Sequence, residues 1–237
     1  MNYNIDIFKY RILQLLHKDM KYFMQFPEFL LDNYDIYLAG GALRDCIIDK
    51  SVKDYDLFLI PKEEYLLELK EEFQSDYDLI EIDLNNIDDY KLIVTYANSK
   101  IHENIFKYFN NPFFIKCTFN NEIGSNKDND YGTNINISHI YEAFIDSNIP
   151  FNIIFTLEKN ITNVIDDFNC NLSQIYLNFN SYLENNFNTD LDDIFISPNF
   201  IKGYMNKHIE IRKENTDTYY NKMLEYFANL GYKIESY

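Results

Sequence analysis

The segment 36–60, IYLAGGALRDCIIDKSVKDYDLFLI, constrains the fold more than any other part of this sequence. A short apolar run at 36–39 predicts a strand, which leads directly into Gly40 and Gly41 and then into a helix over 42–49. A second apolar run at 55–60 predicts a buried strand that ends at Pro61. A strand, a helix and a second strand joined so closely predict a sheet with helices packed on it.

The rest of the chain extends this pattern. Its 237 residues, 46% of them hydrophobic, are enough for one good-sized domain with a smaller annex. The apolar spacing predicts an N-terminal helix from residue 5 to about residue 33, broken near Pro27. We expect further helices at 62–73, 161–166, 200–213 and 217–230, and strands at 79–82, 91–96, 114–119, 151–156 and 172–177.

These elements predict an α+β fold, in which a mixed β-sheet is flanked by helices and followed by a helical C-terminal annex. We expect an N-terminal helical segment at 1–35 that packs on the core, the core itself at 36–180 and the annex at 181–237. In the last helix, Leu224, Phe227 and Leu230 are expected to pack on the core, and Gly231 is expected as the C-cap. The Asn-rich connector at 120–136 is the best candidate for a mobile loop.

The charge of the chain disfavours non-specific binding to nucleic acid. There are 21 basic and 38 acidic residues, a net charge of −17, and such a surface repels phosphate backbones. The densest basic group is interpreted as a solvated helix face; it comprises Lys202, Lys207, His208, Arg212 and Lys213. The acidic surface leaves a protein partner open.

The cysteines and histidines indicate neither a disulfide framework nor a zinc site. The three cysteines are odd in number and far apart, and the four histidines lack metal-ligand spacing. No apolar run approaches the ~20 residues needed to cross a membrane. We therefore expect a soluble protein in a reducing compartment, the cytoplasm, with no membrane partner.

Gly40 and Gly41 have a chemical interpretation as well as a structural one. A strand that runs through two glycines into a helix brings free backbone N–H groups to one point, where an anion can approach closely. Arg44, one turn into the helix, would add a charge-assisted contact to a phosphate. The alternative is an ordinary tight turn, since glycine is common in turns.

Asp54 and Asp56 form one of several D-x-D pairs in this chain, and their position distinguishes them. They begin the predicted buried strand, and residues two apart on a strand project to the same face. Two carboxylates on one face repel each other and are costly to desolvate, so a divalent cation is the usual neutralising partner. The alternative is a strand start with both acids in solvent.

The order of these features resembles a known family signature. G-G-A-L-R-D at 40–45, eight further residues and D-Y-D-L at 54–57 are similar to the polymerase-β-like nucleotidyltransferase superfamily. Within it the stretch resembles the head of tRNA nucleotidyltransferases and bacterial poly(A) polymerases, and also small viral and phage-type nucleotidyltransferases. The resemblance covers residues 36–60, about a tenth of the chain.

The resemblance implies a role for each residue of the signature. Gly40 and Gly41 would cradle the triphosphate, and Arg44 with Asp45 would shape the nucleotide pocket. The metal ligands would be Asp54 and Asp56, holding two Mg²⁺ ions, for which Mn²⁺ can substitute. Lys53, just before the pair, would touch a phosphate or else face solvent.

Members of this superfamily usually carry a third carboxylate on a later strand. The matching region is 164–176, where that position falls on Asn169, whose amide can offer an oxygen to a metal but cannot act as a base. Asp167 lies two residues earlier on the same predicted strand face and is a candidate to replace it. A shifted third acid, a two-carboxylate site and an inactive relative all stay open.

The implied function is a metal-dependent transfer of a nucleoside monophosphate from an NTP to an acceptor hydroxyl, with release of pyrophosphate. The motif favours an RNA or tRNA 3′ end as acceptor and a cytoplasmic protein (host cytoplasm if the chain is viral), whereas the net charge favours a protein or small-molecule acceptor. A second hypothesis is a catalytically impaired relative that acts as a nucleotide-binding or protein-interaction module.

Overall fold

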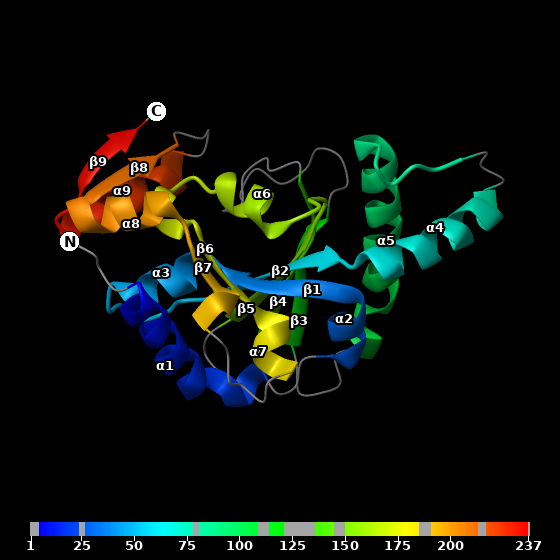
Figure 1. Ribbon diagram of the computed structural model, residues 1–237, viewed down its shortest axis with the longest axis horizontal. Helices are drawn as coiled ribbons and strands as arrows, with labels where there is room; N and C mark the ends of the chain where they lie inside the picture. The colour runs from blue at the N-terminus through cyan, green and yellow to red at the C-terminus, as the bar shows by residue number, and fades with distance from the viewer. Residues whose placement is uncertain are drawn as a thin grey trace.

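A seven-stranded mixed sheet forms the centre of the computed structural model, which describes residues 5–23, 27–77, 81–108, 114–120, 136–144, 150–184, 191–212 and 217–236 (Figure 1). The strand order is β3-β4-β5-β2-β1-β6-β7. The strands are β1 Tyr34–Ala39, β2 Tyr55–Pro61, β3 Phe114–Asn120, β4 Ile137–Phe144, β5 Pro150–Thr156, β6 Ile175–Asn178 and β7 Ile194–Ile196. The expectation of a mixed sheet flanked by helices is confirmed.

Helices cover both faces of this sheet (Figure 1). Within the described ranges they are α1 Asp6–Phe23, α2 Glu28–Asn33, α3 Gly41–Ile47, α4 Glu63–Tyr77, α5 Ile87–Tyr108, α6 Ile161–Asp166, α7 Phe179–Glu184, α8 Pro198–Asn206 and α9 Asp217–Asn229. Figure 1 shows α1 and α7 on one side of the sheet and α6 on the other. Pro27 is the N-cap of α2, at the place where the sequence predicts a break.

The middle of the sheet is built by β1, β2 and β5. Strand β2 pairs antiparallel with β1 and parallel with β5. Its alternate residues separate the two faces: Leu57 and Leu59 pack in the core under α1 and α3, whereas Phe58 and Ile60 pack with residues of α6. This alternation places Asp56 on the same face as Phe58 and Ile60.

The strand predicted at 91–96 is wrong, because these residues lie within α5. Ile93, Val94 and Ala97 are buried at the 3- and 4-residue spacing of a helix face, which packs against α4. The β-branched residues imitated a strand. Of the strand predicted at 79–82, the described residues Glu81 and Ile82 lie outside any helix or strand. The connector at 120–136 lies almost wholly outside the described residues.

The helix predicted at 200–213 is confirmed up to residue 206 and wrong beyond it. Helix α8 ends at Asn206, because Lys207 adopts a left-handed conformation with φ of 50°. The chain then forms β8 (His208–Ile211), which pairs in parallel with β9 (Lys233–Ser236). The annex therefore contains a small sheet as well as helices, and the basic group at 202–213 is not one helix face.

Other expectations for the second half are confirmed in outline. A 3₁₀ turn at Asn171–Ser173 occupies the start of the strand predicted at 172–177, and β6 begins only at Ile175. Phe227 of α9 is fully buried, with Leu224 and Leu230 packed beside it, and Gly231 follows with φ of 76°. These annex residues share one apolar cluster with the central sheet. The division into three parts stays a prediction.

Candidate active site

The turn between β1 and α3 depends on glycine at its first position. Gly40 has φ of 82° and ψ of −129°, a conformation that residues with a side chain rarely adopt. A Cβ at Gly40 would also lie 3.4 Å from the ring of Phe168. At Gly41 the nearest atom to such a Cβ is Nη2 of Arg44, at 3.5 Å, which is ordinary van der Waals contact. The backbone conformation therefore explains Gly40 and leaves Gly41 unexplained.

The two aspartates of the D-x-D pair lie beside this turn. Asp54 precedes β2, and Asp56 is paired in register with Ala39 on one side and Asn152 on the other. Oδ2 of Asp56 lies 4.0 Å from the point that a Cβ on Gly40 would occupy. Both aspartates are half-buried. The structure thus brings the two sequence features, glycine turn and acid pair, to one place.

Asp56 receives a hydrogen bond from a neighbouring strand. The Nδ2 atom of Asn152 in β5 donates to Oδ1 of Asp56 at 2.9 Å. The parallel register of β2 and β5 puts these two residues side by side, so the contact follows from the sheet itself. Within the described residues, no cluster of three or more acidic, histidine or cysteine side chains is arranged to hold a metal ion. The side chain that β5 places beside Asp56 is therefore the amide of Asn152 and not a carboxylate.

The carboxylate of Asp54 lies in surroundings that disfavour its negative charge. Its pKa is raised to about 6, chiefly by burial and also by the negative charges of Asp56 and Asp45, against the opposing effect of Arg44 and Lys53. Two neighbouring carboxylates that the surrounding cations do not fully compensate have the donor chemistry and the charge to bind a divalent cation. The residues present therefore fit a magnesium or manganese ion.

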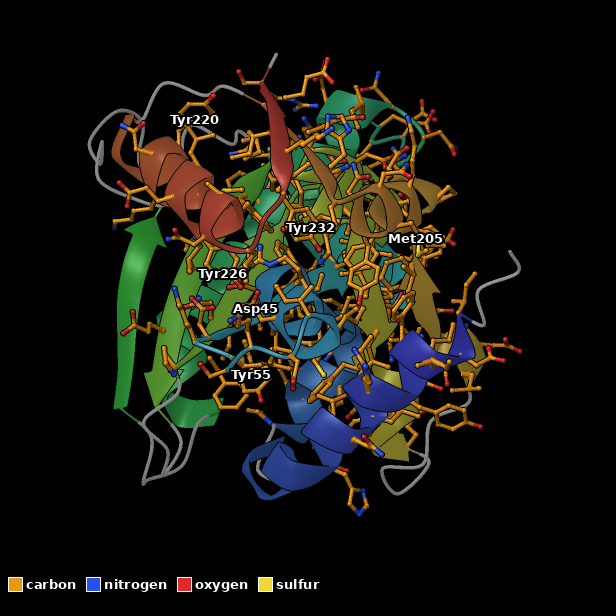
Figure 2. The ribbon with its side chains drawn as sticks, turned by 90° about the vertical axis from the view of Figure 1, so that its left-hand side faces the viewer. Asp45, Tyr55, Met205, Tyr220, Tyr226 and Tyr232 are labelled. Atoms are coloured by element: carbon orange, nitrogen blue, oxygen red, sulfur yellow. The ribbon has the colours of Figure 1, made fainter. Side chains whose placement is uncertain are left out.

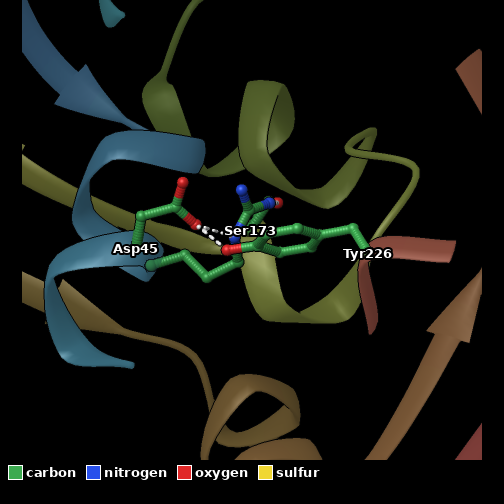
Figure 3. A network of polar contacts seen from close by, with 4 residues as sticks. Asp45, Ser173 and Tyr226 are labelled. Carbon is green, nitrogen blue, oxygen red and sulfur yellow. Dashed lines mark hydrogen bonds and ion pairs between the residues drawn. The ribbon is translucent and has the colours of Figure 1, made fainter. Parts of the chain in front are cut away.

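Arg44 and Asp45 form a buried network with the C-terminal helix (Figure 3). Nε of Arg44 lies 2.7 Å from Oδ1 of Asp45, and the same oxygen accepts a hydrogen bond from the hydroxyl of Tyr226 at 3.0 Å. Nη1 of Arg44 donates to Oγ of Ser173 at 3.2 Å. Burial lowers the pKa of Arg44, but the adjacent carboxylate of Asp45 outweighs this effect and raises it, so the guanidinium stays charged.

Aromatic rings surround the two cations of the site. The guanidinium carbon of Arg44 lies 5.5 Å from the ring centre of Tyr226 and 5.4 Å from that of Phe227. The ammonium group of Lys53 lies 5.6 Å from the ring of Tyr226. Lys53 itself is exposed. Cation–π attraction holds both side chains near the glycine turn and the acid pair.

Within the segment 167–169, Asp167 is bonded near one end of strand β5. The Oδ2 atom of Asp167 accepts a hydrogen bond from Asn136 at 3.4 Å, and the carbonyl of Asn136 bonds Leu157, just past the end of β5. Asn152 lies near the other end of that strand, about 16 Å away along an extended backbone. Asp167 is therefore bonded to Asn136, whose backbone partner lies past the opposite end of β5 from Asn152.

The backbone of Asn169 is bonded to the annex: its carbonyl accepts a hydrogen bond from the N–H of Arg212 at 2.8 Å. Between the two polar residues, Phe168 reaches the glycine turn, and its ring lies 5.6 Å from that of Phe58. Phe168 is therefore a residue that this segment brings to the turn. A role of Asp167 or Asn169 as the third acid stays a prediction.

Sequence reasoning missed two residues of this site, Asn152 and Tyr226. Asn152 is a polar residue inside the apolar run of β5, and that interruption is the signal that was available. Tyr226 lies 181 residues from Asp45 in the sequence, and nothing local to α9 indicates the contact. None of the helices in the described ranges has the length and apolar character needed to cross a bilayer.

Comparisons with known proteins give likenesses in structure but not in sequence. No protein-family model and no curated protein matches the chain. Among solved structures, it is similar to a CCA-adding enzyme in its apo form, with a TM-score of 0.42 and 11% identity over 98% of this chain and 39% of that one. A tRNA-processing enzyme has a TM-score of 0.41 and 11% identity, over 99% of this chain and 45% of the other.

The Thermotoga maritima CCA-adding enzyme complexed with tRNA is similar at a TM-score of 0.40 and 10% identity, over 98% of this chain and 39% of that one. The chain thus spans less than half the length of each of these structures. Likenesses of this size carry no conclusion about activity, which has to be argued from the side chains of the site.

Proposed function

We propose that the protein is a metal-dependent nucleotidyltransferase, which moves a nucleoside monophosphate from an NTP to an acceptor hydroxyl. The observation that carries the proposal is the half-buried pair Asp54 and Asp56 beside the turn at Gly40 and Gly41. The raised pKa of Asp54 marks the pair as an uncompensated negative site. Together these features match the needs of phosphoryl transfer, where catalysis is mainly positioning and neutralisation of charge.

Asp54 and Asp56 would hold the divalent cations, two Mg²⁺ ions or Mn²⁺ in their place. Once bound, such ions neutralise the phosphate charge and stabilise the attacking and leaving oxygens. In the proposed reaction the acceptor oxygen forms a bond to the α-phosphorus, and the bond to the pyrophosphate oxygen breaks. Asn152 holds Asp56 in place through its hydrogen bond.

The remaining residues would bind the triphosphate. Gly41 leaves space for a ligand beside the edge of Arg44, and Lys53 carries a second positive charge next to Asp54. The guanidinium of Arg44 is already held by Asp45 and Ser173, so it is a fixed rather than a mobile contact. Fixed donors stabilise charge without reorganising during the reaction.

The acceptor we propose is an RNA or tRNA 3′ end, because of the sequence signature, in a cytoplasmic setting. The net charge of −17 opposes extensive contact with an RNA backbone, so a protein side chain, a small molecule or a short oligonucleotide is the competing acceptor. These acceptors belong in the same assay.

A second candidate function is a nucleotide-binding or protein-interaction module without turnover. The observation that favours it is the amide of Asn152 beside Asp56, where a carboxylate would supply a base. This candidate shares the binding site with the first and differs only in the chemical step.

Transfer of label from each NTP, with Mg²⁺ or Mn²⁺ and a panel of acceptors, tests the proposal. We expect transfer by the native protein and its loss in Asp54→Asn. The matched control is Asp192→Asn, the same change in an exposed aspartate of another D-x-D pair. NTP binding without transfer to any acceptor supports the second candidate, and full transfer by Asp54→Asn rejects the metal-ligand role.

A further inference from the structure

Helix α9 is connected to the glycine turn through Tyr226. The hydroxyl of Tyr226 donates to Oδ1 of Asp45 at 3.0 Å, and the same oxygen holds Nε of Arg44 at 2.7 Å. Nη2 of that arginine lies 3.5 Å from the point that a Cβ on Gly41 would occupy. A set of polar contacts therefore runs from Tyr226 of the annex through Asp45 to Arg44, whose guanidinium lies beside Gly41 (Figure 3).

The ring of Tyr226 makes a second set of contacts. It lies within 5.5 Å of the guanidinium carbon of Arg44 and 5.6 Å of the ammonium group of Lys53, measured from the ring centre. A cation within about 6 Å of an aromatic ring is attracted to its face. Lys53 directly precedes Asp54, so the ring restrains a long, exposed side chain beside the acid pair.

The buried core residues of helix α9 do not include Tyr226, whose ring packs only partly buried against the same cluster. Phe227 is fully buried and Met223 nearly so, and both lie in the core cluster that the annex shares with the sheet. Tyr226 is only half-buried, and Figure 2 shows it beside Asp45 at the surface that faces the viewer. Its hydroxyl serves a buried carboxylate rather than the apolar contact between helix and core.

The annex has a second attachment near the site. The N–H of Arg212, at the end of β8, donates to the carbonyl of Asn169, and Ile211 forms a β-bridge with Cys170. These residues adjoin Phe168, whose ring lies against Gly40. The annex therefore holds the turn from two directions.

We propose that Tyr226 is a positioning residue of the nucleotide site, fixing Arg44 beside Gly41 and Lys53 beside Asp54 so that both cations meet the phosphates of a nucleoside triphosphate. This inference rests on the proposed nucleotidyltransferase function and makes the C-terminal annex a part of the site. The hydroxyl acts through Asp45, and the ring acts directly on the two cations.

The test compares three variants of the full chain. Tyr226→Phe removes the hydroxyl and keeps the ring, and Tyr226→Ala removes both. The matched control is Tyr220→Phe, which changes a half-buried tyrosine on the same helix, far from Asp45 in Figure 2. Calorimetric titration with each of the four ribonucleoside triphosphates and Mn²⁺ gives Kd, label transfer gives KM and kcat, and thermal unfolding reports stability.

We expect the Kd and KM of Tyr226→Phe to rise about tenfold, the effect of one hydrogen bond to a charged group, with kcat within about twofold of the native value. Tyr226→Ala is expected to weaken binding further, because both cations lose the ring. Tyr220→Phe should bind as the native protein does. A purely structural tyrosine would lower the unfolding temperature and leave the Kd of the folded protein unchanged.

Native affinity in Tyr226→Phe overturns the inference while the proposed function stands. This variant decides the question even if Tyr226→Ala fails to fold, because it keeps the ring and its packing. Failure of the native protein to bind any of the four nucleotides with Mn²⁺ overturns the proposed function and this inference together.

Discussion

Asp45 and Asp54 lie nine residues apart in the sequence, and the fold gives them opposite surroundings. Asp45 is the more deeply buried, with 5% of its surface exposed, and it is matched by Arg44 and by the hydroxyl of Tyr226. Asp54 is less buried, and its pKa is raised chiefly by that partial burial and also by the negative charges of Asp56 and Asp45, which Arg44 and Lys53 oppose without cancelling. Burial alone therefore does not identify a functional carboxylate; the absence of full compensation by the protein is more informative.

The largest expected effect is on the compensated aspartate. Asp45→Asn leaves the guanidinium of Arg44 in a poorly hydrated position without its anion, and breaking such a pair costs about 3 kcal/mol or more of folding free energy. Urea unfolding gives the change directly. Asp54→Asn is the matched control, since it is the same substitution in the uncompensated residue, and it is expected to act in the opposite direction. A shift of both variants in the same direction would contradict the comparison.

The glycine turn offers a second contrast. Gly40→Ala forces an alanine into a backbone conformation with φ of 82°, and we expect a loss of about 1–3 kcal/mol of stability. Gly41→Ala meets no such strain, so the protein should fold normally and bind NTP more weakly, because the methyl group fills the space beside Arg44. Thermal unfolding and nucleotide titration on both variants separate the two effects. Normal nucleotide affinity in Gly41→Ala would remove Gly41 from the site.

The pH dependence of the acid pair follows from the sign of the shift. The pKa of Asp54 is about 6 in the folded protein, above its usual value of 3.8, so the ionised carboxylate destabilises the fold at pH 7–8, and the penalty falls as pH is lowered through 6 and vanishes below about 4. In metal-free buffer at pH 7.5, Asp54→Asn should therefore be more stable than the native protein. We expect a gain of about 1–2 kcal/mol, after allowance for solvent screening of a half-buried residue.

Divalent metal should reverse that order. We expect Mn²⁺ to bind the folded native protein and to raise its unfolding temperature, whereas Asp54→Asn should respond little, since the amide replaces a proposed ligand. Unfolding curves at several pH values, with EDTA and with Mn²⁺, make the measurement. An equal response of the two proteins to Mn²⁺ would argue against a metal on Asp54.

The smallest effect is expected at Lys53. Lys53 is exposed, and its ammonium group lies over the ring of Tyr226, so Lys53→Met should change stability by less than about 0.5 kcal/mol. Nucleotide affinity should fall a few-fold at low salt, and the difference should shrink as salt is raised. Lys202→Met, an exposed lysine on α8, is the control. If the nucleotide affinity of both variants does not depend on salt, Lys53 does not contact the nucleotide and only faces solvent.

The local part of the site could be predicted from the sequence, because Gly40, Gly41 and the two aspartates are positioned by one strand–helix–strand segment. The long-range part could not. Asn152 reaches Asp56 only through the parallel register of β2 and β5, and strand register between distant segments is not visible in a single sequence. The strand predicted at 91–96 was wrong for a different reason. Its β-branched residues suggested a strand, whereas the segment forms part of α5 because one helix face is buried.

The contact between Tyr226 and Asp45 also has a consequence for the order of synthesis. A ribosome adds roughly 5–20 residues per second, so the 181 residues between the two partners take roughly 10–40 s to emerge. Throughout that time the nascent chain already contains Arg44, Asp45 and the acid pair, but not the hydroxyl that joins them to the annex. The contacts that join Arg44 and Asp45 to the annex therefore form late in translation, well after the first strands of the protein have been made.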